Sequence, residues 1–243
     1  EVTGFKRKLS FDNLKTVFLF LKGVKRAKQL LREFQPDIVV GTGGYVCGPV
    51  VYAAAKSGIP TLIHEQNVVP GLTNKFLSRF VDCVAVSFPG SERAFRKARK
   101  TVVTGNPRAT EVTRASGING RKALNIPESC DIVVVVGGSR GAKSLNEAMV
   151  DMVPCLSRLP ETHFVYVTGK HYYDSTVRQI QEAGGRLPNN MHIVPYLDNM
   201  PDVLAATSLI IGRSGASSLA EITALGIPSI LVPSANVTNN HQE

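Results

Sequence analysis

The sequence predicts an α/β protein with two domains, each built on a parallel β-sheet covered by helices. Short runs of apolar, mostly β-branched residues alternate with helical patterns along all 243 residues, which is typical of parallel sheets. Glycine-rich loops follow three of the predicted strands and precede helices, as in sheets that bind ligands at their carboxyl ends. Hydrophobic residues make up 43% of the chain and charged residues 19%, a composition that supplies two buried cores and excludes a disordered chain.

The sequence also disfavours a membrane-spanning protein and a zinc or disulfide protein. The longest apolar runs, residues 17–21 and 132–136, are far shorter than the ~20 residues of a spanning helix, and no signal-peptide pattern precedes them. The four cysteines lie 25 to 47 residues apart and form no CxxC pair. We therefore expect a protein of the reducing cytoplasm with no bound metal.

The first predicted domain spans residues 1–108 and begins with a helix over residues 12–34. Apolar residues recur in this helix at spacings of three and four, from Leu14 to Leu31. A short strand at 38–40 ends in the loop Gly41-Thr42-Gly43-Gly44-Tyr45. Further helices are predicted at residues 49–56, 73–80 and 91–100, and further strands at residues 61–64, 83–86 and 101–104.

A polar, glycine-bearing stretch at residues 105–121 separates the predicted domains, and we place the boundary after Arg108. Residues 1–108 hold 18 Lys and Arg against 7 Asp and Glu, whereas residues 109–243 hold 10 against 12. In the second domain, strands are predicted at residues 132–136, 164–168, 191–194, 208–211 and 229–232, and helices at 144–156, 173–183, 201–206 and 217–225. Both ends are expected to be incomplete, because the sequence opens on a crossover helix and closes on a helix start.

Two loops in the second domain have the composition of phosphate-binding loops. Each follows a strand and precedes a helix, where unpaired backbone N–H groups and the positive end of the helix dipole attract anions. The first, Gly137 to Ala142, contains Ser139; the second, Gly212 to Ser218, contains three serines. Tight turns that bind nothing are the alternative. Neither loop has the spacing GxGxxG or GxxxxGK[ST], so a dinucleotide enzyme and a P-loop nucleotide triphosphatase are disfavoured.

Polar side chains near the predicted strand ends suggest how a nucleotide sugar would be held. Glu221 lies three residues after Ser218, where a carboxylate can accept both hydroxyls of a ribose or can simply cap the helix. His64-Glu65-Gln66-Asn67 follow directly on a strand and can orient sugar hydroxyls, although His64 can equally be a strand-end histidine with only structural partners. Arg108 places a guanidinium at the domain junction, where it can hold a diphosphate.

The first 32 residues carry nine Lys and Arg against two acidic residues, and such a segment attracts an anionic partner or is simply a solvated surface. Phe11, Leu19 and Phe20 fall outside the regular apolar stripe of the helix and are flanked by Lys15 and Lys22. This composition suits a helix that lies on an anionic membrane surface. We expect the regular stripe, with Leu14, Val17, Phe18 and Leu21, to be covered by strands that would precede residue 1, which leaves the residues outside the stripe to lipid.

Several motifs together resemble the MurG family of peptidoglycan N-acetylglucosaminyltransferases. They are Gly41-Thr42-Gly43-Gly44-Tyr45, His64-Glu65-Gln66-Asn67, Pro70-Gly71-Leu72-Thr73-Asn74-Lys75, Gly105-Asn106-Pro107-Arg108, Gly137-Gly138-Ser139-Arg140-Gly141-Ala142, Arg213-Ser214-Gly215-Ala216 with Glu221, and Asn240-His241-Gln242. The resemblance implies a GT-B fold, in which two Rossmann-like, doubly wound domains face a cleft. It also implies an inverting hexosyltransferase without a bound metal or cofactor, which moves GlcNAc from UDP-GlcNAc to lipid I, a polyprenyl-pyrophosphoryl acceptor, to make lipid II.

The resemblance assigns roles to individual residues and to the two domains. The second domain would bind UDP-GlcNAc, and the first, on the membrane side, would bind the acceptor, with the protein peripheral on the cytoplasmic face of the membrane. Thr42, Gly43, Gly44 and Tyr45 would face the acceptor pyrophosphate, and Leu197 would hold the uracil through its backbone. The other donor-binding residues would be Asn67, Arg108, Ser139, Ala216, Ser217, Ser218, Glu221 and Gln242. The catalytic base would be a histidine upstream of residue 1, with His64 as the fallback, so this chain is expected to bind donor and lack the base.

Two other functions fit parts of the sequence. A UDP-GlcNAc 2-epimerase of the same architecture would also bind the donor, but it gives no reason for a basic, apolar first helix. A non-catalytic polyanion-binding protein would explain the charge of residues 1–108. Because the sequence lacks the interleaved aromatic residues and the known modules of nucleic-acid readers, we expect no nucleic-acid partner.

Overall fold

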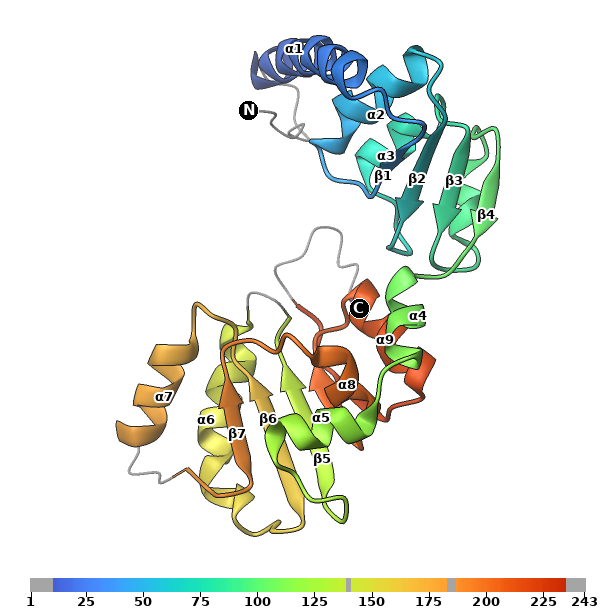
Figure 1. Cartoon of the computed structure of the whole chain (residues 1–243). Helices are drawn as coiled ribbons and strands as arrows, with labels where there is room; N and C mark the ends of the chain where they lie inside the picture. Colours follow the sequence, from blue (N-terminus) through green and yellow to red (C-terminus); the bar gives the residue numbers. More distant parts are fainter. Residues whose placement is uncertain (1–10, 139–140, 183–186, 235–243) are drawn as a thin grey trace. The chain divides into compact units, whose positions relative to one another are not determined.

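The computed structural model describes residues 11–138, 141–182 and 187–234, with backbone only for residues 11–15 (Figure 1). The chain forms two compact units, residues 1–106 and residues 107–243, and each is described below by itself. Each contains a parallel sheet, as the sequence predicts. Within the described residues, no helix is long and apolar enough to cross a membrane.

The first unit contains a four-stranded parallel sheet in the order β1-β2-β3-β4. Its strands are β1 (Val39–Gly41), β2 (Thr61–Glu65), β3 (Cys83–Val86) and β4 (Thr101–Val103), and its helices are α1 (Phe11–Phe34), α2 (Cys47–Lys56), α3 (Leu72–Leu77) and the 3₁₀-helix η1 (Ser91–Phe95). Ile63 and Val84 on the sheet pack against Val51 of α2, Leu77 of α3 and Phe95 of η1. Burying these apolar side chains holds the sheet and its helices together.

Helix α1 packs through the last part of its predicted apolar stripe and through Phe20, which the sequence places outside that stripe. Ala27 and Leu31 pack on Ala53 and Ala54 of α2, and small side chains allow the two helices to approach closely. Phe20 lies on the same side of α1, because it precedes Ala27 by seven residues, or two helical turns. Its ring contacts those of Tyr52 and Phe76, with centroids 5.9 and 5.8 Å apart.

In its first turns, the regular apolar stripe of α1 is exposed within this chain, and its expected covering by strands ahead of residue 1 stays a prediction. Val17, Phe18 and Leu21 are exposed, and Phe18 is 67% exposed. Phe20, expected to be available to lipid, is instead half-buried in the aromatic cluster, and Leu19 is half-buried as well. In the first turns of α1 the apolar residues lie on two sides of the helix, and the rings of Tyr52 and Phe76 contact the side that carries Phe20.

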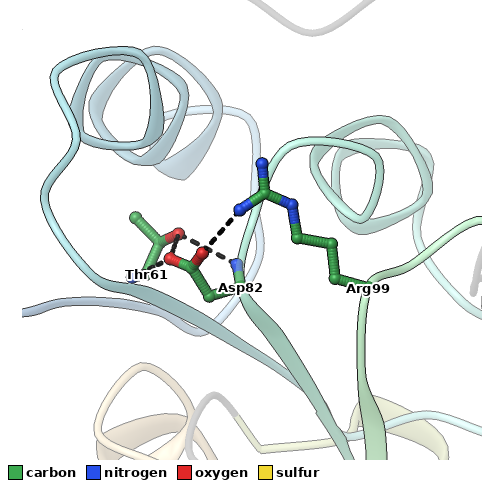
Figure 2. Close-up of polar contacts among 3 residues, drawn as sticks. All are labelled: Thr61, Asp82 and Arg99. Carbon is green, nitrogen blue, oxygen red and sulfur yellow. Dashed lines mark hydrogen bonds and ion pairs between the residues drawn. The ribbon is translucent and has the colours of Figure 1, made fainter.

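Polar contacts fix the amino-terminal ends of β2 and β3, as Figure 2 shows. The backbone N–H and the hydroxyl of Thr61 donate to Oδ2 of Asp82 at 2.9 and 3.0 Å, and the N–H of Asp82 donates back to the Thr61 hydroxyl at 3.2 Å. Arg99 donates to Oδ1 of Asp82 at 2.9 Å. The backbone and side-chain hydrogen bonds from Thr61 lower the pKa of Asp82, and the charge of Arg99 adds to this.

The basic helix predicted at residues 91–100 is largely absent, because only η1 forms there. Phe95 is the one large apolar residue of the stretch 91–100, and it is buried in the core. The arginines and lysines that surround Phe95 leave no apolar stripe for a longer helix to bury. A single buried ring therefore anchors one short 3₁₀ segment.

The second unit is a five-stranded parallel sheet in the order β7-β6-β5-β8-β9, with helices on both faces. Its strands are β5 (Asp131–Val136), β6 (Thr162–Val167), β7 (Met191–Val194), β8 (Leu209–Gly212) and β9 (Ser229–Leu231), and its helices are α4 (Pro107–Thr113), α5 (Gly117–Leu124), α6 (Lys143–Leu156), α7 (Tyr173–Glu182), α8 (Met200–Ala205) and α9 (Ala216–Leu225). Phe164 and Tyr166 pack on the side of α6 and α7. Val165 and Val167 pack on the opposite side, with residues of α4, α8 and α9.

Helices α4 and α5 occupy the stretch that the sequence predicts as a polar linker. Val112 of α4 is buried in the core. Helix α5 packs against α8 so closely that a Cβ atom at Gly120 would lie 2.3 Å from the carbonyl oxygen of Asp202. Because this contact requires glycine, the residue that suggests a loop in the sequence marks tight helix packing in the structure.

Candidate functional site

The two glycine-rich loops of the second unit begin from neighbouring strands. Val136 at the end of β5 pairs with Gly212 at the end of β8, so the loops that follow start side by side. The strand order reverses at this pair, since β5 leads to β6 on one side and β8 leads to β9 on the other. Ligands of open parallel sheets bind at such a reversal, outside the carboxyl ends of the strands.

The first loop is shaped by a glycine that no other residue can replace without movement. Gly141 has a φ of +76°, and a Cβ atom there would lie 2.1 Å from the carbonyl oxygen of Thr168. The loop therefore lies against the end of β6 before α6 begins at Lys143. Ser139, the predicted diphosphate ligand of this loop, lies outside the described residues.

The second loop leads into α9 through Gly215, which has no side chain to cap the helix. Ala216, Ser217 and Ser218 are the first three residues of α9, so their N–H groups have no helical acceptor. The hydroxyl of Ser214 is buried and has no hydrogen-bond partner within the described part of the chain. This end of α9 thus offers N–H and O–H donors, together with the positive end of the helix dipole, to an anion.

Arg213, in the same loop, has a structural role. Its guanidinium donates to the carbonyl oxygens of Val232 and Pro233 at 3.1 and 2.6 Å, and to the hydroxyl of Ser144 at 3.0 Å. One side chain therefore connects the loop after β8, the segment after β9 and the first turn of α6. Its contacts hold these three segments together.

Glu221 lies in the second turn of α9 and is buried, with a side-chain exposure of 11%. Arg108 of α4 donates to its Oε1 from Nε at 2.7 Å and approaches the same oxygen with Nη2 at 2.6 Å. Burial alone would lower the pKa of Arg108, but the hydrogen bond and charge of Glu221 outweigh it and raise that pKa. Two residues that are 113 positions apart, both predicted donor ligands, are therefore in direct contact.

Tyr196 and Lys170 belong to the same region, although the sequence does not single them out. Nζ of Lys170 lies 5.3 Å from the centre of the Tyr196 ring, and Tyr196 is among the residues that raise the pKa of Arg108. Leu197, the next residue, has its side chain in the core, so only its backbone is available to the uracil of a nucleotide. Because Lys170 and Tyr196 follow β6 and β7, their place beyond two strand ends is the signal that could have identified them.

In the first unit, Glu65 organises the loop that the predicted ligand Asn67 belongs to. Its Oε1 accepts from the backbone and the side chain of Asn67 at 3.0 and 3.1 Å, and its Oε2 accepts from the N–H of Gly71 at 3.0 Å. The side-chain amide of Asn74 also donates to Oε2, at 2.9 Å. Four N–H donors thus satisfy a carboxylate that is almost fully buried.

The loop predicted to face the acceptor, residues 42–45, lies next to Asn74, one of the hydrogen-bond donors to Glu65. Gly43 and Gly44 have φ values of +95° and +76°, and a Cβ atom at Gly43 would lie 3.4 Å from Nδ2 of Asn74. Thr42 and Tyr45 are exposed, and α2 begins two residues after Tyr45 without a side-chain cap. The loop therefore presents an uncapped helix N-terminus together with exposed hydroxyl groups.

His64 is engaged through both ring nitrogens. Nε2 lies 3.1 Å from the carbonyl oxygen of Gly105, and Nδ1 lies 3.4 Å from the side-chain nitrogen of Gln66. Since Gly105 can only accept and that nitrogen can only donate, we assign the proton to Nε2 and the lone pair to Nδ1. The lone pair that a general base would use is already hydrogen-bonded, which favours the structural role for His64.

The structure divides the predicted donor residues between the units. Arg108, Leu197, Ala216–Ser218 and Glu221 belong to the second unit, and Asn67 belongs to the first. Gln242 lies outside the described residues, and so do the side chains of Phe11 and Lys15. Among the residues that the structure describes, no group of three or more His, Cys, Asp and Glu could hold a metal ion.

Comparison with known proteins gives consistent matches along the chain. Residues 1–86 match the glycosyltransferase family 28 N-terminal domain, and residues 132–243 match the glycosyltransferase family 28 C-terminal domain. A protein of Halalkalibacterium halodurans named UDP-N-acetylglucosamine–N-acetylmuramyl-(pentapeptide) pyrophosphoryl-undecaprenol N-acetylglucosamine transferase is 56% identical over 243 residues. The match covers all of this chain and 66% of that protein, so the chain spans about two thirds of the relative's length.

Solved structures show the same architecture. The crystal structure of Acinetobacter baumannii MurG is 31% identical, with a TM-score of 0.65 over 99% of this chain and 64% of that one. UDP-GlcNAc 2-epimerase from Neisseria meningitidis, solved with UDP-GlcNAc bound, has a TM-score of 0.62 over 93% of this chain and 66% of its own, at 16% identity. At that identity the epimerase supports the fold alone. The two parallel-sheet units are of the GT-B type.

Proposed function

The chain belongs to glycosyltransferase family 28. We propose that it forms the donor-binding unit and part of the acceptor-binding unit of a UDP-GlcNAc-dependent N-acetylglucosaminyltransferase that converts lipid I to lipid II. The observation that carries this proposal is the group of donors and acceptors at the strand reversal of the second unit. An uncapped helix N-terminus suits a diphosphate, and the carboxylate of Glu221 lies on the next turn of the same helix. That pairing fits the diphosphate and ribose of one nucleotide.

In this proposal, the N–H groups of residues 216–218 and the hydroxyl of Ser214 hold the diphosphate. Glu221 accepts from the ribose hydroxyls, and the backbone at Leu197 faces the uracil. When the bond to the sugar breaks, negative charge grows on the departing UDP. Fixed N–H dipoles and the end of helix α9 stabilise that charge without having to reorganise. We propose that these groups stabilise the negative charge of the diphosphate without a resident metal. A chelator should then leave the affinity for UDP unchanged.

The first unit would bind the acceptor. We propose that residues 42–45 and the start of α2 face its pyrophosphate, and that Asn67, held by Glu65, reaches a hydroxyl of the transferred sugar. The acceptor hydroxyl must lose a proton as it attacks. The hydrogen bonds of His64 disfavour it for this step, so we assign the base to the histidine that the family carries ahead of these motifs.

We further propose that α1 places the protein on an anionic membrane surface, because a polyprenyl acceptor stays in the bilayer. The residues that would enter the interface are those that the structure leaves exposed, namely Val17, Phe18 and Leu21. Lys22 and Lys25 are exposed beside them and would contact acidic headgroups.

The decisive experiment follows the product and the donor separately. The chain is titrated by calorimetry with UDP-GlcNAc, with ADP and with RNA. Labelled UDP-GlcNAc and a lipid I analogue are then added to the chain and, separately, to a full-length protein that contains it. Selective binding of UDP-GlcNAc and label in the lipid product of the full-length protein support the proposal. Release of ManNAc would favour a 2-epimerase, and binding of RNA in place of UDP-GlcNAc would favour a polyanion-binding protein.

A further inference from the structure

We propose that Glu111 is a positioning residue of the donor site, which holds Arg108 so that one oxygen of Glu221 is left to the ligand. This inference rests on the proposed function, in which Glu221 accepts from the ribose hydroxyls. It concerns a residue that would touch neither the nucleotide nor the sugar.

The guanidinium of Arg108 divides its contacts unequally between two carboxylates. Nε and Nη2 both contact Oε1 of Glu221, at 2.7 and 2.6 Å. Nη1 points to another residue and contacts Oε2 of Glu111 at 2.5 Å. One guanidinium therefore contacts two carboxylates, and its contacts with the buried carboxylate converge on a single oxygen.

A guanidinium that faces one carboxylate commonly forms two parallel hydrogen bonds, one to each oxygen. Such a pair would occupy both oxygens of Glu221. A ligand hydroxyl would then have to compete with the guanidinium of Arg108 for them. Here the negative charge of Glu111 attracts the far end of the guanidinium, and Oε1 alone receives the near end. Oε2 of Glu221 is then the oxygen that a ribose hydroxyl can reach.

The position of Glu111 makes this role possible. It lies three residues after Arg108 in α4, and residues at this spacing are neighbours on a helix surface. Val112, the next residue, is buried in the core and fixes the rotation of α4. The N–H of Ser116, just beyond α4, donates to Asp202 at 2.8 Å and fixes the end of this segment. The side chain of Glu111 itself is 52% exposed, so it can be changed without leaving a buried group unpaired.

The test compares two ligands that differ only in the hydroxyls that Glu221 would bind. Wild-type chain and Glu111→Gln are titrated by calorimetry with UDP and with 2′,3′-dideoxy-UDP. We expect Glu111→Gln to weaken UDP binding by roughly three- to tenfold, the range of one hydrogen bond, and to leave dideoxy-UDP within about twofold. Glu161→Gln removes an exposed carboxylate just before β6, at the other end of the sheet, and should change neither affinity.

The outcomes separate this inference from the proposed function. If the wild-type chain binds both ligands equally, Glu221 does not hold the ribose and the donor assignment fails. If the wild-type chain prefers UDP but Glu111→Gln keeps that preference in full, or loses both ligands equally, the role of Glu111 is overturned and the donor site stands. A melting temperature of Glu111→Gln equal to that of Glu161→Gln shows that the variant is folded.

Discussion

Oε2 of Glu65 accepts a hydrogen bond from Nδ2 of Asn74 at 2.9 Å, and this contact joins the end of β2 to α3 beneath the glycine loop of the first unit. The same amide group lies 3.4 Å from the carbonyl oxygen of His64. Two acceptors therefore fix the orientation of Asn74, and its amide nitrogen is the atom that lies under Gly43.

We expect Glu65→Gln to destabilise the first unit by about 2–4 kcal/mol, because the new NH₂ group would face N–H donors that have lost their acceptor. Glu33→Gln, an exposed change in the same unit, is the control and should alter the free energy of unfolding by less than ~0.5 kcal/mol. Urea denaturation measures both variants. If both have the wild-type midpoint, Glu65 does not organise the loop.

Glu221→Ala should weaken UDP and UDP-GlcNAc alike, by roughly 1.5–3 kcal/mol, because hydrogen bonds to a charged group are lost. The fold should survive, since Arg108 keeps its contact with Glu111. Calorimetry of the variant beside Glu147→Ala, an exposed change on α6, measures the effect. Unchanged UDP affinity would remove Glu221 from the site.

The stability of the second unit should fall as the pH decreases below about 6.5, the ordinary pKa of histidine. His163 Nδ1 and His192 Nε2 lie 2.9 Å apart, a distance that requires at least one neutral ring. Burial lowers the pKa of both, with Arg121 adding to it for His163 and His163 for His192. The unfolded chain therefore binds more protons than the folded one in this range.

Denaturation midpoints at pH 7.5, 6.5 and 5.5 measure this dependence. His192→Gln should flatten it, whereas His171→Gln, at an exposed position, should retain the wild-type slope. An identical pH dependence in His192→Gln and wild type would show that the pair does not cause it.

Vesicles that contain phosphatidylglycerol should bind the chain, with binding that decreases as salt increases. Phe18→Ser/Leu21→Ser should reduce this binding and leave the melting temperature unchanged, because both side chains are exposed. Phe20→Ser should instead lower the melting temperature, because its ring packs on Tyr52 and Phe76. Ile118→Ser, an exposed apolar change in the second unit, is the matched control for sedimentation.

If Phe18→Ser/Leu21→Ser binds these vesicles as the wild-type chain does, α1 does not enter the interface. Equal binding to neutral and anionic vesicles would contradict the electrostatic part of the proposal.

The strands and most helices could be predicted because their patterns are local. Ile132 to Val136 form a continuous β-branched run between polar loops, and β5 covers these residues with one more at its start. The packing of Phe20 could not be predicted, because it depends on Tyr52 and Phe76, which lie at least 32 residues further along the chain.

Helices α4 and α5 could not be predicted from the sequence, for a different reason. Their apolar residues are few, and Gly117 and Gly120 indicate a loop until the backbone of α8 is known to lie against them. Similarly, Glu221 and Arg108 could each be singled out by position, but their contact spans 113 residues and depends on how α4 packs on α9. Pairings of this kind follow from tertiary packing alone.

The contacts of Arg213 have a consequence for local opening of the second unit. Because one guanidinium binds the carbonyl oxygens of Val232 and Pro233 and the hydroxyl of Ser144, none of these segments can separate from the others without breaking a charged hydrogen bond. Amide hydrogens at the start of α6, after β8 and after β9 should therefore exchange with solvent deuterium as one cooperative group. In Arg213→Ala, the three segments should exchange at separate rates, and the segment after β9, at the edge of the sheet, should exchange first.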